Sequence, residues 1–116
     1  MAEKRYLISV GINDYEHSPI DYSVKDSEDI ISAAISFCNV KEENICHVKS
    51  DTKSPNAAVY DSILKGLERI KVNFVQGEDS LFFYFSGHGA KSGSSTALVM
   101  DGLCSFSSFL SFSRHR

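Results

Sequence analysis

A histidine between two glycines follows an apolar stretch of the sequence. Five apolar or aromatic residues, 81–85, lead directly into Ser86-Gly87-His88-Gly89. A histidine side chain titrates near neutral pH, so His88 is suited to move a proton for a thiol or hydroxyl nucleophile. The glycines carry no Cβ, which lets a reacting carbonyl approach closely, and the N–H of Gly89 can donate to an oxyanion. A structural or merely exposed histidine is the ordinary alternative at the end of a strand.

The cysteines are the other residues with nucleophilic chemistry. There are three of them, Cys38, Cys46 and Cys104, an odd and scattered set that predicts neither a disulfide framework nor a CxxC zinc site. Cys38 and Cys46 fall inside or at the end of predicted elements, where a cysteine commonly acts as a small buried hydrophobe. We therefore expect no metal site and a reducing, cytoplasmic compartment.

Composition excludes several classes of protein. The chain has 116 residues, 42% of them hydrophobic and 23% charged, as expected for one small globular domain. Its formal charge of −3 provides no electrostatic footprint for nucleic acid or an anionic membrane surface. The first apolar run is too short for a signal peptide, and no stretch approaches the ~20 apolar residues of a membrane span.

Strands and helices alternate along the predicted domain. Short apolar runs at 6–12, 43–50 and 79–88 favour strands, the first of them buried on both faces. Apolar residues recur at helical spacing over 24–38 and again from a start at 54–56 to Phe74. The order β-α-β-α-β predicts an α/β fold in which helices cover a parallel sheet in three layers. Chemistry in such sheets gathers at the carboxyl ends of the strands, where His88 falls.

The end of the sequence differs in character from the rest. Residues 96–102, TALVMDG, favour a short strand or a hairpin arm. The last fourteen, LCSFSSFLSFSRHR, alternate serine with phenylalanine and contain no acidic residue. We therefore expect a domain over 1–102 and an atypical tail over 103–116, either foreign to the domain and disordered or a further strand.

Several segments together resemble a known family. YLISVGINDY, YSVKDSEDI, EENI, LFFYFSGHG and TALVMDG occur in the order and at the spacing of the caspase-like cysteine peptidases, in the metacaspase and bacterial caspase-like branch. The resemblance covers roughly residues 6–102, and the apolar strand running into SGHG is its most specific part. It implies a caspase-like α/β/α sandwich, truncated after the third sheet strand, and hydrolysis of peptide or protein substrates.

The resemblance also implies roles for individual residues. His88 matches the catalytic histidine, and Gly89 matches the backbone donor of the oxyanion hole. Asp26 and Ser86 match two walls of the substrate pocket, where an acid favours Arg or Lys before the cut bond. Each pocket residue has a plain alternative, because Asp26 also suits the positive end of a helix dipole and Ser86 suits a turn.

Calcium dependence occurs in part of the family, and the sequence does not reveal whether it applies here. The acidic residues after the first strand, Asp14, Glu16 and Asp21, favour a solvated loop rather than a metal site. We therefore assign no cofactor to this chain from its sequence.

The family's nucleophile has no match in the sequence. It lies on the next sheet strand, ~50 residues after the histidine. Only residues 89–116 follow His88, and the single cysteine among them, Cys104, lies where the resemblance does not support a nucleophile. We therefore expect a peptidase domain that is inactive alone, with its nucleophile unassigned.

Two other functions remain open. An inactive caspase-like module could bind a missing half-domain or a homologous chain through the unpaired edge of the third strand. A small ligand-binding or receiver-like α/β domain is the other, although the sequence has no GxGxxG or P-loop pattern to support it.

Overall fold

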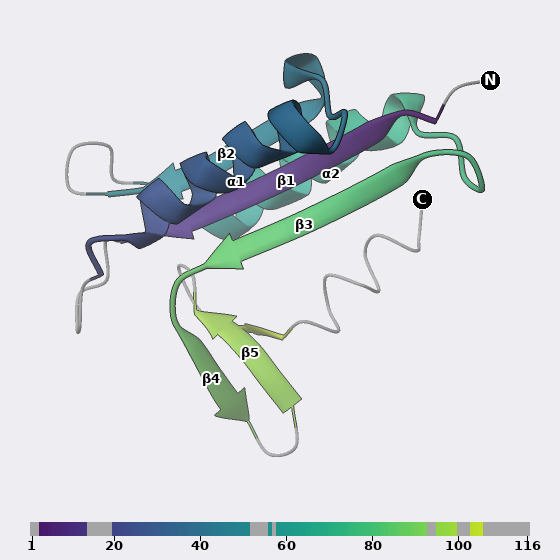
Figure 1. Cartoon of the computed structure of the whole chain (residues 1–116). Coiled ribbons are helices and arrows are strands. Elements are labelled where there is room, and N and C mark those ends of the chain that lie inside the picture. Colours follow the sequence, from purple (N-terminus) through teal and green to yellow (C-terminus); the bar gives the residue numbers. More distant parts are fainter. Residues whose placement is uncertain are drawn as a thin grey trace.

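The computed structural model describes residues 3–13, 20–51, 56, 58–92, 95–99 and 103–105, with the backbone alone from Gly89 onward. The larger part is a three-stranded sheet with two helices, and the smaller part consists of three short strands (Figure 1). In chain order the elements are β1 (Arg5–Ile12), α1 (Ser23–Phe37), a 3₁₀ turn (Glu42–Asn44), β2 (Ile45–Ser50), α2 (Val59–Asn73), β3 (Ser80–Ser86), β4 (Gly89–Ser92), β5 (Ser95–Val99) and β6 (Leu103–Ser105).

The first sheet is parallel and has the order β2-β1-β3. β1 is therefore the central strand, and seven of its eight residues are buried. This confirms the predicted strand that is covered on both faces. The register aligns Gly11 near the end of β1 with Ser86 at the end of β3. The carboxyl ends of β1, β2 and β3 consequently lie at the same edge of the sheet.

The helices cover opposite faces of this sheet. α2 packs Val59, Ile63, Leu67 and Ile70 into the larger hydrophobic core, with alternate residues of β1 such as Ile8 and Val10. Each such aliphatic side chain contributes about 1.5–3 kcal/mol by its burial. α1 packs Ala34 against Leu7 on the other face, with Tyr84 of β3 alongside. The structure confirms the predicted three-layer α/β fold.

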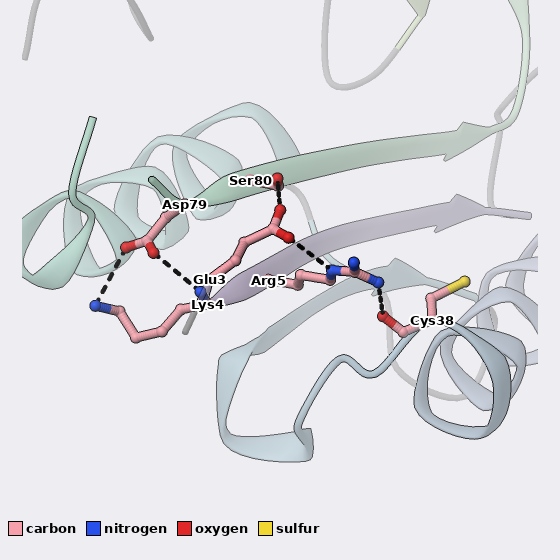
Figure 2. Close-up of polar contacts among 6 residues, drawn as sticks. All are labelled: Glu3, Lys4, Arg5, Cys38, Asp79 and Ser80. Carbon is pink, nitrogen blue, oxygen red and sulfur yellow. Dashed lines mark hydrogen bonds and ion pairs between the residues drawn. The ribbon is translucent and has the colours of Figure 1, made fainter. Parts of the chain in front are cut away.

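Ion pairs and hydrogen bonds join the strands at their amino ends (Figure 2). The carboxylate of Asp79 accepts hydrogen bonds from the backbone N–H of Lys4 at 2.9 Å and of Val75 at 2.8 Å, and pairs with Lys4 Nζ at 3.2 Å. Glu3 contacts the hydroxyl of Ser80 and pairs with Arg5, whose guanidinium donates to the Cys38 carbonyl at 2.8 Å. These contacts fasten β1 to β3 and to the end of α1.

β3 is one of the two edge strands of the parallel sheet. Its partner is β1, and no other strand in the described part of the chain pairs with its second edge. Its side chains are only partly covered: Leu81, Phe83 and Phe85 pack at the margin of the larger core, and Phe82 is 48% exposed. The apolar strand 80–86 therefore presents uncovered surface.

The three short strands form a separate antiparallel sheet in the order β4-β5-β6. β4 begins directly after His88, and β5 provides the hairpin arm expected from TALVMDG (Figure 1). The first residues of the expected tail, 103–105, pair with β5 as β6. The rest of that tail lies outside the described residues.

Neither α1 nor α2, the two helices in the described part of the chain, has the length and apolar character of a membrane span.

Candidate functional site

His88 lies at the carboxyl edge of the parallel sheet. It is half-buried and stands two residues beyond the end of β3, where the chain leaves the first sheet and enters β4 (Figure 1). Gly89 is the first residue of β4. The imidazole is therefore neither enclosed in the core nor remote from the edge at which α/β domains place their chemistry.

Asp26 and Ser86 meet at this same edge. Asp26 lies in the first turn of α1, and Ser86 is the last residue of β3. The Ser86 hydroxyl donates a hydrogen bond to Asp26 Oδ2 at 3.3 Å, across sixty positions of sequence. Both side chains are half-buried. A carboxylate with one long neutral hydrogen bond retains acceptor capacity for a guanidinium or ammonium group.

The absence of a side chain at Gly11 allows α1 to reach this position. A Cβ there would lie 2.5 Å from the Ser23 carbonyl oxygen and 2.8 Å from the Val24 Cα, both backbone atoms of the first turn. Gly11 aligns with Ser86 in the sheet register. The close approach of α1 to β1 is what brings Asp26 beside Ser86.

A polar seam continues under α1. Ser9 Oγ donates to the Ser27 carbonyl at 2.9 Å, and Ser27 Oγ donates to the Val24 carbonyl at 2.6 Å. Nε2 of His47 lies 2.8 Å from Ser27 Oγ. With the hydroxyl proton directed to Val24, the contact fits the imidazole tautomer that carries its proton on Nε2 and donates it to Ser27 Oγ. The seam ties β1, β2 and α1 together at Ser27, the residue directly after Asp26.

Burial lowers the pKa of His47. The nearby charge of Lys49 lowers it further, and Glu28 on α1 opposes the shift. The sequence reasoning did not single out His47. A single histidine in a weakly predicted strand gives no indication of a functional role. Its hydrogen-bond partner, Ser27, lies on another element.

Asn13 is the second residue that sequence reasoning missed. Its Oδ1 accepts the backbone N–H of Val24 at 3.0 Å, which satisfies one of the free donors at the start of α1. Close by, the hydroxyl of Ser23 is fully buried and has no hydrogen-bond partner among the residues that the structure describes. The only local signal for Asn13 is a polar residue directly after a buried strand.

Two of the cysteines, Cys38 and Cys46, lie away from the edge of the sheet that carries His88. Cys38 is the C-cap residue of α1 and is exposed, so the expected burial of Cys38 is wrong, because the residue lies past the last turn instead of on the buried face of the helix. Cys46 is buried near the amino end of β2. Neither thiol lies at the edge that carries His88.

Cys104 lies in the same small sheet as Gly89, the residue that follows His88. It aligns with Leu98 of β5, which in turn aligns with Gly89 of β4. Two strand spacings, about 10 Å in all, therefore separate the backbone of Cys104 from that of Gly89.

The described part of the chain contains no cluster of three or more His, Cys, Asp or Glu side chains that could hold a metal ion. Asp21 is exposed, and Asp14 and Glu16 lie outside the described residues. A shallow hollow between β2 and α2 lies at the amino ends of the strands, lined by residues such as Glu43, Cys46 and Arg69. None of the predicted site residues lines this hollow.

The three-layer α/β fold agrees with what the caspase-like resemblance implies. The family model of the metacaspase, peptidase C14 domain matches residues 4–103. Because this match spans most of the chain, the protein belongs to the metacaspase family of caspase-like peptidases. The comparison with curated proteins returned no match.

Proposed function

We propose that this chain is the part of a caspase-like cysteine endopeptidase that holds the catalytic histidine and selects a basic residue before the cut bond. The observation that carries the proposal is the contact between Asp26 and Ser86 at the edge that bears His88. A carboxylate near the catalytic base attracts the guanidinium of Arg or the ammonium of Lys.

The cytoplasmic location of the protein stays a prediction from its cysteine usage.

The chemistry assigned to His88 is proton transfer. A cysteine thiolate attacks the scissile carbonyl carbon, and the imidazole accepts the thiol proton and returns it to the leaving amine. The N–H of Gly89 donates to the oxyanion that forms. Water then cleaves the acyl-enzyme and releases the second product.

We propose that none of Cys38, Cys46 and Cys104 is the nucleophile, and that another segment supplies it. Cys38 and Cys46 lie toward the amino edge of the sheet, away from His88. Cys104 is separated from Gly89 by an intervening strand. The chain alone is therefore expected to bind peptides without cleaving them.

Reporter peptides ending in Arg or Lys test the assignment, with and without calcium. The purified chain should give no turnover, whereas turnover should appear when a metacaspase segment carrying the cysteine strand is supplied in trans. His88→Ala should abolish that turnover, because the thiol then lacks its base. Turnover by the chain alone that Cys104→Ala removes would overturn the assignment of the nucleophile. Turnover indifferent to His88→Ala would overturn the role of the histidine.

The uncovered edge of β3 favours a second function, that of an inactive interaction module. The strand contains no charged residue, and charges are a usual means of blocking edge-to-edge pairing. A homologous chain or a missing half-domain could add a strand there. Light scattering after size exclusion should show self-association or partner binding that Phe82→Lys weakens. A stable monomer that binds no metacaspase segment would count against this function.

A further inference from the structure

The start of α1 is capped from outside the helix. Tyr22, the residue at the N-cap position, makes no side-chain hydrogen bond to the first turn. Asn13 supplies that bond instead, since its Oδ1 accepts the Val24 N–H at 3.0 Å. Val24 is 6% exposed, so water has little access to replace this acceptor. Loss of the Asn13 side chain would leave a nearly buried N–H without a partner.

The backbone of Asn13 is itself held in place. Its N–H donates to the Ser50 carbonyl at 2.8 Å, and its carbonyl accepts from the Ile20 N–H at 2.9 Å. Asn13 thereby joins the end of β1 to the end of β2 and to the chain that enters α1. Three hydrogen bonds at one residue make it a fixed point at the carboxyl edge.

The capped turn is the one that carries Asp26. The N–H of Asp26 donates to the Tyr22 carbonyl at 2.9 Å, which closes the first turn of the helix. The Asp26 carboxylate can accept from Ser86 only when this turn is formed. If the turn frays, the fraction of molecules able to bind a cation at Asp26 falls, and the apparent affinity falls with it.

We propose that Asn13 is a positioning residue for basic side chains, acting by holding the first turn of α1 so that Asp26 stays beside Ser86. The inference rests on the proposed function, because it assumes that Asp26 receives the basic residue. It adds a specificity role for a residue that does not itself touch the substrate.

The experiment measures binding of acetyl-arginine amide to the full chain by ¹⁵N NMR, with acetyl-citrulline amide as the uncharged control. In the wild-type chain the arginine probe should shift the amides of Asp26 and Ser86. Asn13→Ala should weaken binding about three- to tenfold, the range that loss of one helix cap supports. It should also speed hydrogen exchange at the Val24 amide.

Two further variants separate positioning from general loss of stability. Asn13→Asp keeps an oxygen acceptor, so it should restore slow exchange at Val24 together with binding. Ile70→Val trims the core on the opposite face of the sheet, and it should lower the melting temperature while leaving the affinity unchanged. Affinity that follows melting temperature across all the variants would overturn the positioning role.

The failures of the two proposals are distinguishable. If the wild-type chain binds no arginine probe, recognition of a basic residue by Asp26 is wrong, and the specificity role of Asn13 falls with it. If the wild-type chain binds and Asn13→Ala binds equally well with fast exchange at Val24, only the role of Asn13 is wrong.

Discussion

The two ends of the parallel sheet both carry acidic side chains, yet they use them differently. At the amino edge, the Asp79 carboxylate accepts the backbone N–H of Lys4 and pairs with the Lys4 ammonium (Figure 2). It also accepts the backbone N–H of Val75, and its side chain is only 2% exposed. At the carboxyl edge, the half-buried Asp26 carboxylate accepts one hydroxyl from the described residues, that of Ser86 at 3.3 Å. The Ser23 hydroxyl nearby is buried, and no described residue is its hydrogen-bond partner.

The difference agrees with the proposal that Asp79 holds the fold whereas Asp26 binds a basic side chain. Burial by itself raises the pKa of Asp79, but the hydrogen bonds from Lys4 and Val75 and the charge of Lys4 outweigh it, so the pKa is lowered. These three contacts take up most of the acceptor sites of the Asp79 carboxylate, and its side chain is almost fully buried, which leaves little room for a ligand. Asp26 accepts only the long hydrogen bond from Ser86 within the described part of the chain, and it lies at the edge where α/β domains bind ligands.

The largest expected effect is on the docking of α1 at the carboxyl edge. Gly11→Ala should destabilise the protein by about 3 kcal/mol, because the new Cβ meets backbone atoms that cannot move aside. Thermal unfolding should show a melting temperature lower by roughly 10–20 °C.

Gly66→Ala is the matched control for that substitution. Its new Cβ meets the Cys46 thiol at 2.6 Å, which is a side chain, and alanine is favoured over glycine within a helix by about 1 kcal/mol. We expect a change within about 1 kcal/mol. Equal losses for the two variants would contradict the close docking at Gly11.

The second prediction compares the two acids directly by stability. Asp79→Asn should lower the melting temperature at neutral pH, because the amide loses the pairing with Lys4 and presents an N–H₂ to backbone donors. Asp26→Asn should change stability by less than about 0.5 kcal/mol, as for a site that holds little of the fold. A larger loss of stability for Asp26→Asn than for Asp79→Asn would contradict the structural role given to Asp79.

The pH dependence gives that comparison a second readout. The folded pKa of Asp79 lies below its ordinary value of 3.8, so its stabilising effect is present above that pH and is lost as the pH falls through the folded value. The deficit of Asp79→Asn should therefore shrink below about pH 4. Denaturant unfolding at several pH values measures this deficit.

The smallest effect concerns the seam beneath α1. The folded pKa of His47 is lowered below 6.5, mainly by burial, so the unfolded chain takes up a proton more readily. This contribution to stability is complete above pH 6.5 and is lost as the pH falls below it. His47→Gln, which keeps an N–H donor for Ser27, should flatten the slope of stability against pH between 6.5 and the folded value. An unchanged slope would mean that His47 does not titrate differently on folding.

The sequence predicted the elements better than the contacts between them. Hydrophobic periodicity located three strands and two helices within a few residues, because each pattern is local. The apolar run before His88 sufficed to place the histidine at the end of a strand. Contacts such as Asn13 with Val24 and Ser27 with His47 were not predicted, because each joins two elements and depends on how they pack.

The amino-edge cluster was missed for the same reason. Lys4 and Asp79 are seventy-five positions apart, and nothing in either neighbourhood indicates the other. Family resemblance did propose Asp26 and Ser86 together, since it carries information about distant positions that periodicity does not. The exposure of Cys38 was mispredicted because the end of a helix is its least predictable part.

The most direct test of the central claim is to map where a guanidinium binds on the folded chain. Acetyl-arginine amide should shift the amide resonances of Asp26, Ser86 and His88, and Asp26→Asn should remove the shifts while Asp79→Asn leaves them. Shifts that centre on Lys4 and Asp79, or that persist unchanged in Asp26→Asn, would contradict the claim that the carboxyl edge selects the substrate.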